Sequence, residues 1–319
     1  MKGIVKSIVN ITDLGVLKKH CGIWYEWSTD TAGNKLLKAN MNKYVHNLIS
    51  DYERDFGMIK EKTTPGAPNN TLTKHEGTPI DIEFYRSYLG RVMYYVTKLA
   101  PECSNASREL SQHMANPGPI HWEAMDRMIG YLKSKKEHVL YYRKPSELRI
   151  IAYVDSNFAT NLDTRRSVTG TIMTLGGGSL LQWVSKTQHS VTLSSTEAEY
   201  VALAACAQEI RFQQMLLTEL VAKQQTLPSV IYEDNTGAIF LVKNKQVGGR
   251  TKHIDTRHHF IRELVEKKVI QVTFIRSEKN YADVLTKNVI DRIFTPHAKA
   301  MIYGVVSGWR EDVGKGEQE

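Results

Sequence analysis

The order of apolar and helical segments in the second half of the chain constrains the fold more than any other feature. Short β-branched runs there alternate with longer segments of helical periodicity. In chain order the pattern predicts strands at 148–155, 167–175 and 179–185, a helix at 194–222, a strand at 229–234, helices at 235–242 and 255–267, a strand at 269–276 and a helix at 280–288. This order favours a mixed α/β domain.

Four acidic residues stand at the ends or starts of these elements. They are Asp155 and Asp234, each ending a predicted strand, Glu199 in the long helix and Asp283 in the last helix. Open α/β sheets place their sites at the carboxyl ends of strands. Converging carboxylates repel one another unless cations lie among them. Two Mg²⁺ ions roughly 3.5–4 Å apart would supply that charge and catalyse phosphodiester hydrolysis, so the pattern indicates a two-metal nuclease site.

Each of these acids also has a structural interpretation. Aspartates commonly form turns at strand ends, and Asp283 in a first helical turn would favour the helix dipole. Glu197 and Glu199 compete for the site, because residues two apart point about 200° apart round a helix. Glu197 suits the first turn after Ser194 or Ser195 as a capping residue. Glu233 should point away from Asp234, on the opposite face of its strand.

The first half of the chain is predicted to be mainly helical. After an aromatic, strand-like run at 22–27, helical spacing covers Leu37 to Tyr52, 81–100, 105–114 and 121–134, with a loop at 62–79 and an extended connector at 138–145. The loop is rich in Pro, Gly, Thr and Asn, which favour turns. We divide the chain into parts at 1–147, 148–295 and 296–319, the last a polar tail.

Composition limits the class of protein. The formal net charge of +8 favours a polyanionic partner, although many unrelated proteins share such an excess. The cysteines Cys21, Cys103 and Cys206 lie far apart, so we expect no thiolate zinc site and a reducing compartment. No apolar run reaches the roughly 18 residues that a membrane span needs. We therefore expect no membrane contact and a cytoplasmic or nuclear protein.

An ordered series of motifs carries a family resemblance. The series is YVDSNFA at 153–159, RRSVTG at 165–170, WVSKTQHSVTLSSTEAEYVAL at 183–203, EDNTGAI at 233–239, RTKHIDTRHHFIRE at 250–263 and YADVLTK at 281–287. It resembles the ribonuclease H domain of copia-type (pseudovirus) retrotransposon Pol polyproteins. The first half is similar to the thumb and connection end of the reverse transcriptase in such proteins. We name the parts accordingly: a reverse-transcriptase-like part, a ribonuclease H-like domain and a tail.

The resemblance implies a fold, an activity and a cofactor. The fold would be a ribonuclease H-like mixed sheet flanked by helices, preceded by a mainly helical, thumb- and connection-like segment. The activity would be endonucleolytic hydrolysis of the RNA strand in RNA–DNA hybrids, with two Mg²⁺ ions for which Mn²⁺ can substitute. The family pattern selects Glu199 over Glu197 and assigns catalysis and metal binding to Asp155, Glu199, Asp234 and Asp283.

Substrate contacts should go mostly to the nucleic-acid backbone, because a hybrid is recognised by its shape, phosphates and 2′-hydroxyls. The candidates are Arg165, Arg166, Lys186, Arg250, Lys252 and His253. Each of them could equally be an ordinary solvated charge. Many ribonucleases H carry a histidine just before the last aspartate, but residues 271–282 contain none.

One absence separates the chain from an intact polymerase. The polymerase signature of the family is a Tyr-x-Asp-Asp turn, and no Asp-Asp dipeptide occurs in this sequence. We therefore expect no DNA synthesis from a chain that resembles the part downstream of that turn. Its partners would be the hybrid and other parts of a Pol polyprotein, within a virus-like particle if the element is active. Two alternatives stay open: a non-catalytic, nucleic-acid-binding or domesticated remnant, and an integrase-like nuclease of the same fold family.

Overall fold

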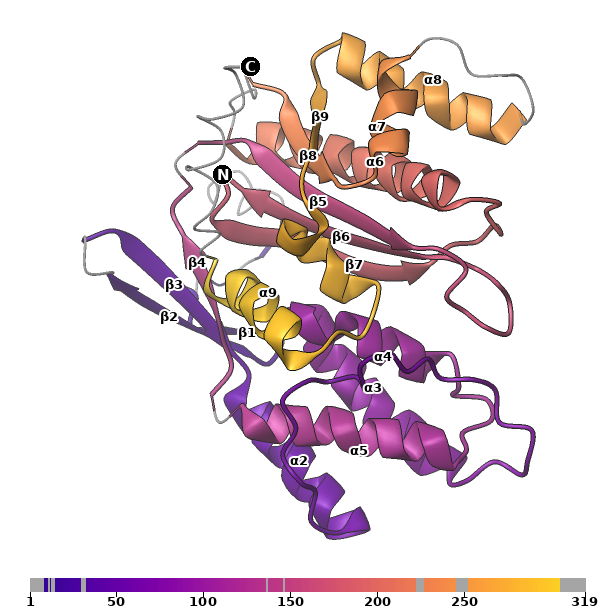
Figure 1. Cartoon of the computed structure of the whole chain (residues 1–319). Coiled ribbons are helices and arrows are strands. Elements are labelled where there is room, and N and C mark those ends of the chain that lie inside the picture. Colours follow the sequence, from indigo (N-terminus) through magenta and orange to yellow (C-terminus); the bar gives the residue numbers. More distant parts are fainter. Residues whose placement is uncertain are drawn as a thin grey trace.

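The computed structural model of the chain describes residues 9–10, 12, 15–29, 33–135, 137–145, 147–221, 227–244 and 252–304. Figure 1 shows two β-sheets, with helices above the larger sheet and further helices below it. One sheet belongs to the first half of the chain and the other to the second half. None of the helices in the described part is both long and apolar enough to pass through a membrane.

The first half combines a small antiparallel sheet with a group of helices. The sheet has the order β1-β2-β3-β4, with β1 at Lys19–His20, β2 at Ile23–Thr29, β3 at Lys35–Asn40 and β4 at Val139–Arg143. The helices are α2 (Asn42–Phe56), α3 (Ile82–Leu99), the 3₁₀ helix η1 (Pro101–Cys103), α4 (Ser104–Ser111) and α5 (Pro119–Ser134). The expectation of a mainly helical first half is confirmed.

One local prediction in this half was wrong, and another was incomplete. Leu37 was expected in a helix, but it lies in β3, where it pairs with Trp27 of β2 and Tyr142 of β4. The extended connector at 138–145 contains the strand β4, which is the second partner of β3. At Leu37, pairing with distant strands decides the local structure, because ladder hydrogen bonds and cross-strand packing outweigh local periodicity.

The second half forms a five-stranded mixed sheet of order β7-β6-β5-β8-β9. Its strands are β5 (Ile150–Asn157), β6 (Val168–Leu175), β7 (Ser179–Thr187), β8 (Ser229–Glu233) and β9 (Ile270–Phe274). Strands β5, β6 and β7 pair antiparallel, whereas β8 pairs parallel with both β5 and β9. The predicted mixed sheet flanked by helices is confirmed.

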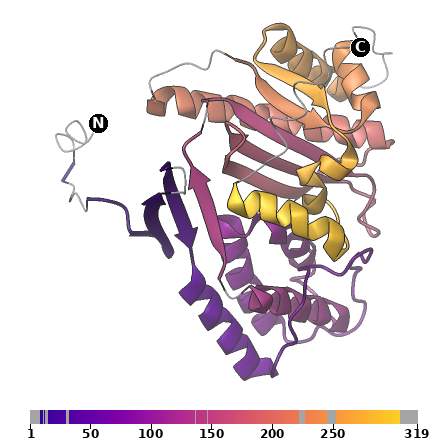
Figure 2. The same cartoon turned by 60° about the vertical axis from the view of Figure 1, so that its left-hand side comes forward.

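Helices cover both faces of this sheet, as Figures 1 and 2 show. One face carries α6 (Ser195–Val221), α7 (Thr236–Lys243) and α8 (Lys252–Glu266), and a single apolar core joins them to β5 through Ile150, Ala152 and Val154. The opposite face, which includes Tyr153, packs against the helices of the first half. Alternate residues of β5 therefore face two different cores, as the two-residue period of a strand requires.

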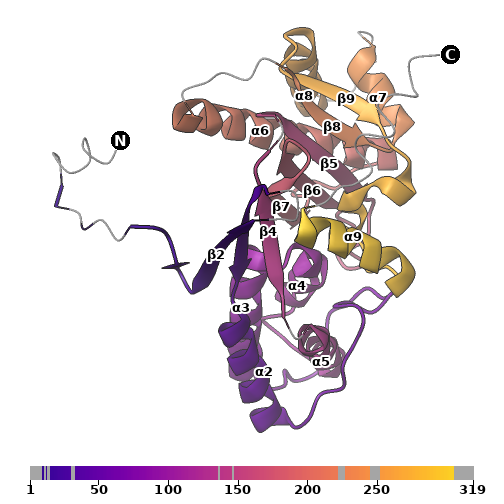
Figure 3. The same cartoon turned by 90° about the vertical axis from the view of Figure 1, so that its left-hand side faces the viewer.

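The end of the described chain packs against the second of these cores. It contains the 3₁₀ helices η2 (Ser277–Lys279) and η3 (Tyr281–Leu285) and the α-helix α9 (Asp291–Tyr303). The segment around Asp283 was predicted as an α-helix, but it forms η3, a single tight turn. Figure 3 shows α9 below the larger sheet. The division at 147/148 and 295/296 stays a prediction. Helix α9 runs across the predicted boundary at 295/296. Much of the expected tail, residues 305–319, lies outside the described residues.

Candidate active site

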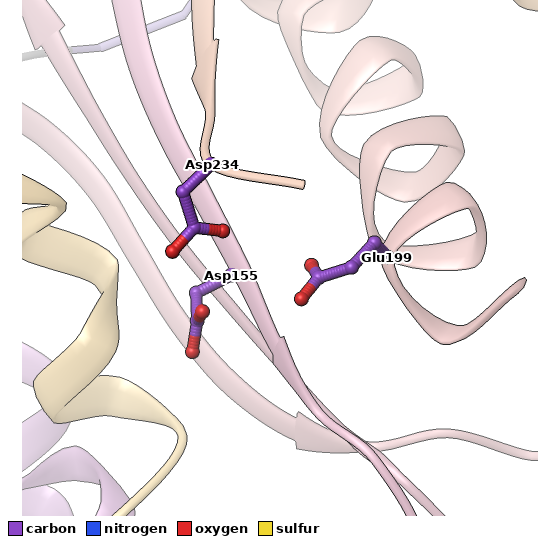
Figure 4. A group of neighbouring side chains, drawn as sticks. All are labelled: Asp155, Glu199 and Asp234. Atoms are coloured by element: carbon purple, nitrogen blue, oxygen red, sulfur yellow. The ribbon is translucent and has the colours of Figure 1, made fainter. Parts of the chain in front are cut away.

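Three of the four predicted acidic residues meet at one end of the mixed sheet. Asp155 lies near the end of β5, and Asp234 follows the last residue of β8. These strands are parallel neighbours in which Tyr153 pairs with Tyr232, so Asp155 and Asp234 stand side by side two residues further on. Glu199 reaches the same place from α6 (Figure 4). One carboxylate oxygen from each of Asp155, Glu199 and Asp234 lies within 4.8 Å of the other two.

The start of helix α6 determines which glutamate reaches this place. The Ser194 hydroxyl accepts a hydrogen bond from the Glu197 backbone N–H at 3.1 Å, and Glu197 Oε2 accepts one from the Leu193 backbone N–H at 2.7 Å. Such reciprocal contacts satisfy the free donors of a helix start. Glu197 is therefore occupied as a capping residue, whereas Glu199 is buried and faces the two aspartates.

Asp283 lies beside this group but outside the set of three. The Asn280 side chain caps η3 by accepting from the Ala282 backbone N–H at 3.2 Å, and it donates to the Val154 carbonyl at 2.8 Å. Thr286, directly after η3, provides a second link to β5, because its hydroxyl donates to Oδ2 of Asp155. The buried Asp283 carboxylate pairs with the Lys287 ammonium, Oδ1 to Nζ, at 2.5 Å.

Burial and mutual repulsion make the acidic group costly to ionise. Burial raises the pKa of Asp155 to about 6; the Lys287 ammonium opposes this, while the Asp283 charge adds to it. Burial also raises the pKa of Glu199 to about 11, and the charge of Glu233 is the next largest cause. Without a bound cation, Glu199 therefore favours its protonated form, and Asp155 takes up a proton at a higher pH than an ordinary aspartate.

Sequence reasoning missed Glu233 as part of this electrostatic environment. It is fully buried, its Oε1 accepts from the Asn235 backbone N–H at 2.9 Å, and burial raises its pKa well above the ordinary value. Glu233 was expected to point away from Asp234. Its charge nevertheless raises the pKa of Glu199 more than the charge of Asp155 does. The available signal was a glutamate inside an apolar strand, since a buried charge is rare unless it is paired.

Lys287 is the second residue that sequence reasoning missed. It lies four positions after Asp283, so a helical turn can bring the two side chains together. Burial lowers the pKa of Lys287, but the Asp155 and Asp283 carboxylates raise it more, so that the net shift is upward. The spacing in YADVLTK contains this signal, but only the fold places the pair next to Asp155.

The donor set fits a divalent cation. Carboxylate oxygens are the hard ligands that Mg²⁺ and Mn²⁺ prefer. Among the described residues, Glu199 Oε2 and Glu233 Oε2 are buried without a hydrogen-bond partner. A buried polar atom without a partner carries a desolvation cost that a cation would remove. The group Asp155, Glu199 and Asp234 can therefore hold such an ion.

The predicted substrate-binding residues fall into two sets. Arg165, Arg166 and Lys186 are exposed, the first two in the loop between β5 and β6 and the third in β7. Arg250 lies outside the described residues, and Lys252 and His253 begin α8, with side chains that the structure does not describe. Substrate contact by these six residues stays a prediction.

The strand order, the mixed pairing and the flanking helices define a ribonuclease H-like fold, with an acidic group at adjacent strand ends. Among curated proteins, the chain is 32% identical over 297 residues to the retrovirus-related Pol polyprotein from transposon TNT 1-94 of Nicotiana tabacum. It is 38% identical over 252 residues to the corresponding polyprotein from transposon RE2 of Arabidopsis thaliana. These matches cover 91% and 79% of this chain. The chain belongs to the family of copia-type retrotransposon Pol polyproteins.

The match covers only a small part of these relatives. The chain spans 22% of the length of the tobacco polyprotein and 17% of the Arabidopsis polyprotein. No protein-family model matches the chain. Among solved structures, it is similar to the LC11 ribonuclease H1 isolated from compost, with 21% identity, a TM-score of 0.35, and coverage of 46% of this chain and 97% of that one. A second structure of LC11 ribonuclease H1, in complex with an RNA/DNA hybrid, gives 20% identity, a TM-score of 0.33, and coverage of 45% and 98%.

Proposed function

We propose that the chain is a metal-dependent endoribonuclease that cleaves the RNA strand of RNA–DNA hybrids. The observation that carries this proposal is the meeting of Asp155, Glu199 and Asp234 within 4.8 Å at the end of the mixed sheet. Membership of the Pol polyprotein family supports the same conclusion. So does the complex of LC11 ribonuclease H1 with an RNA/DNA hybrid, as a property of that protein.

The chain supplies the ligands and the rigid frame for this reaction. Asp155, Glu199 and Asp234 would hold divalent ions, and Asp283 would complete the set. Two bound Mg²⁺ or Mn²⁺ ions would supply an activated water and charge stabilisation at the leaving oxygen. The protein holds Asp155 in place through β5 and the Thr286 hydroxyl. Because the ligands come from regular elements, their positions are set before substrate arrives.

Substrate recognition would rest on exposed cations near the acidic group. Arg165, Arg166 and Lys186 are free to contact phosphates on a hybrid, whose 2′-hydroxyls distinguish it from duplex DNA. We also propose a cytoplasmic or nuclear location, or a virus-like particle, with other Pol segments as partners. DNA synthesis is not expected.

A cleavage assay tests the proposal. A 5′-labelled RNA–DNA hybrid is incubated with the full chain in Mg²⁺ or Mn²⁺, beside single-stranded RNA and duplex DNA. We expect metal-dependent cutting of the hybrid only, and its loss in D155N. Asp291→Asn, in the first turn of α9, is the matched control and should retain cutting. No cutting with either ion, or equal cutting by D155N, would contradict the proposal, and cutting of plain duplex DNA would favour an integrase-like nuclease.

A further inference from the structure

The Lys287 ammonium is a cation that the protein itself provides at the acidic site. Its Nζ lies 2.5 Å from Oδ1 of Asp283, whose side chain is only 10% exposed. The group of three carboxylates has no such contact, since none of its members forms an ion pair with a described lysine or arginine. Among the four predicted ligands, Asp283 is thus the one that forms an ion pair with a lysine or arginine of the described residues, while the Lys287 charge also acts on Asp155.

The backbone around Lys287 is held in place from both sides. On one side, Thr286 is fully buried and its hydroxyl donates to Asp155. On the other side, the Asn288 side chain accepts from the Asn105 amide at 2.9 Å and donates to Glu109 at 2.7 Å, which anchors it to α4. The main chain at 287 therefore cannot move away easily, and the lysine side chain is directed to the site.

The Lys287 side chain itself retains freedom to leave Asp283. It is 44% exposed, in contrast to the buried carboxylate that it contacts. A lysine has a flexible four-carbon stem and a compact charge, so its ammonium can rotate into solvent or toward a phosphate without a change in the backbone. A divalent ion beside Asp283 would compete with this ammonium for the same carboxylate oxygen.

From this geometry we infer that Lys287 is a positioning residue that holds Asp283 in the metal-free protein and competes with a divalent ion for it. The inference rests on the proposed function, because it assigns Asp283 to the second of two ions. Asp155, Glu199 and Asp234 would hold the first ion, where competition from Lys287 is weaker because the ammonium acts on Asp155 through its charge, without an ion pair. Asp283 would accept the second ion only after the ammonium gives it up, so Lys287 would weaken the binding of that ion and ease its release after cleavage.

Direct metal binding tests this inference without nucleic acid. Mn²⁺ is titrated into the full chain and the free ion is measured by electron paramagnetic resonance. We expect K287M to bind the second ion about tenfold more tightly than the unchanged protein, with a smaller effect on the first, because a competing cation has been removed. K287R retains a charge and should restore the weaker binding. K287Q provides a second neutral variant should K287M fail to fold.

Lys267→Met is the matched control. Lys267, directly after α8, forms an ion pair with Glu263 of that helix at the same four-residue spacing and the same 2.5 Å. Its removal should leave both Mn²⁺ affinities unchanged. Second-ion affinities equal to that of the unchanged protein in both neutral variants, or weaker than it, would overturn the inference.

The two proposals can fail separately. If the unchanged protein cuts no hybrid but K287M binds the second ion more tightly, the positioning role stands and the proposed function does not. If the hybrid is cut and K287M binds Mn²⁺ like the K267M control, the function stands and the positioning role does not. In an active enzyme, K287M should also reach half-maximal cutting at a lower Mg²⁺ concentration.

Discussion

Gly170 of β6 lies directly opposite Asp155 of β5 in the antiparallel pair. A Cβ at this glycine would lie 2.7 Å from Cγ2 of Thr286, 2.9 Å from the Ala282 carbonyl oxygen and 3.0 Å from Cβ of Leu285. The missing side chain therefore lets the turn that carries Asp283 pack onto the sheet beside Asp155. This gives a physical reason for the glycine at the end of the motif RRSVTG.

Substitution of Gly170 by alanine should displace this turn. The added methyl group would meet backbone and buried side-chain atoms, and overpacking of this kind costs about 1–3 kcal/mol. We expect G170A to unfold at a lower urea concentration and to lose hybrid cleavage by more than its stability loss explains. Parallel urea melts and cleavage rates below the melting range measure both effects.

Gly90 offers the control for this substitution. It lies in α3, where an added Cβ would meet nothing within 4 Å. Alanine is favoured over glycine inside a helix by roughly 0.5–1 kcal/mol, so G90A should be neutral or slightly stabilising. Equal behaviour of G170A and G90A would show that the close approach at Gly170 is unimportant.

Asp155→Asn should raise the stability of the metal-free protein and lower its cleavage activity. The asparagine has nearly the same shape and can still accept the Thr286 hydroxyl, but it removes a buried charge that repels Asp283 and Asp234. We expect the metal-free variant to be more stable at pH 8, by on the order of 1–3 kcal/mol, because its folded form no longer ionises a carboxyl group whose pKa is raised. Its hybrid cleavage should fall by at least about 10³-fold if Asp155 is a metal ligand. A variant both destabilised and active would contradict this assignment.

Glu197 and Glu199 should respond in opposite ways to substitution. E197A removes the acceptor for the Leu193 N–H, so it should cost about 1 kcal/mol of stability and leave the cleavage rate nearly unchanged. E199Q keeps the size of a buried side chain in the acidic group, so it should preserve folding and abolish cleavage. Circular-dichroism melts and cleavage assays on both variants check the pair. Loss of cleavage in E197A with normal cleavage in E199Q would reverse the assignment.

Much of the fold follows from the sequence, because the segments of the second half have distinct periods. The strand at 148–155 and the helix at 194–222 differ from β5 and α6 by at most two residues at either end. The prediction for Leu37 was wrong because its segment lacks such a distinct period. Its helical spacing continues into α2, and only its pairing with Trp27 and Tyr142 makes it a strand residue. Local pattern cannot supply such long-range partners.

The acidic site was predictable only in part. Strand ends in an α/β sheet attract functional residues, so the sequence alone suffices to pair the aspartates at 155 and 234. The effect of Glu233 on the acidic site depends on how deeply α6 buries it. The effect of Lys287 on the site depends on the place where η3 packs against β6. Neither depth of burial nor the packing of a turn against a sheet is contained in local spacing.

The stability of the metal-free protein should fall as the pH rises from 7 to 8. Glu199, with a pKa of about 11 in the folded state, keeps its proton in this range, and the raised pKa of Glu233 acts in the same direction. In the unfolded chain both would be ionised, so folding takes up protons and the free energy of unfolding decreases with pH. The histidines whose pKa burial lowers, such as His113, act in the opposite sense, but only below about pH 6.5.

The expected loss between pH 7 and 8 is on the order of 1 kcal/mol in EDTA. Urea unfolding at both pH values measures it, with E199Q as the comparison. E199Q removes one of the two titrating groups and should show a smaller loss. Saturating Mg²⁺ should abolish the loss in the unchanged protein, because a bound cation keeps the carboxylates ionised in the folded state. Identical pH slopes for both proteins in EDTA would mean that Glu199 ionises normally, and that the carboxylates are not held close together in the metal-free state.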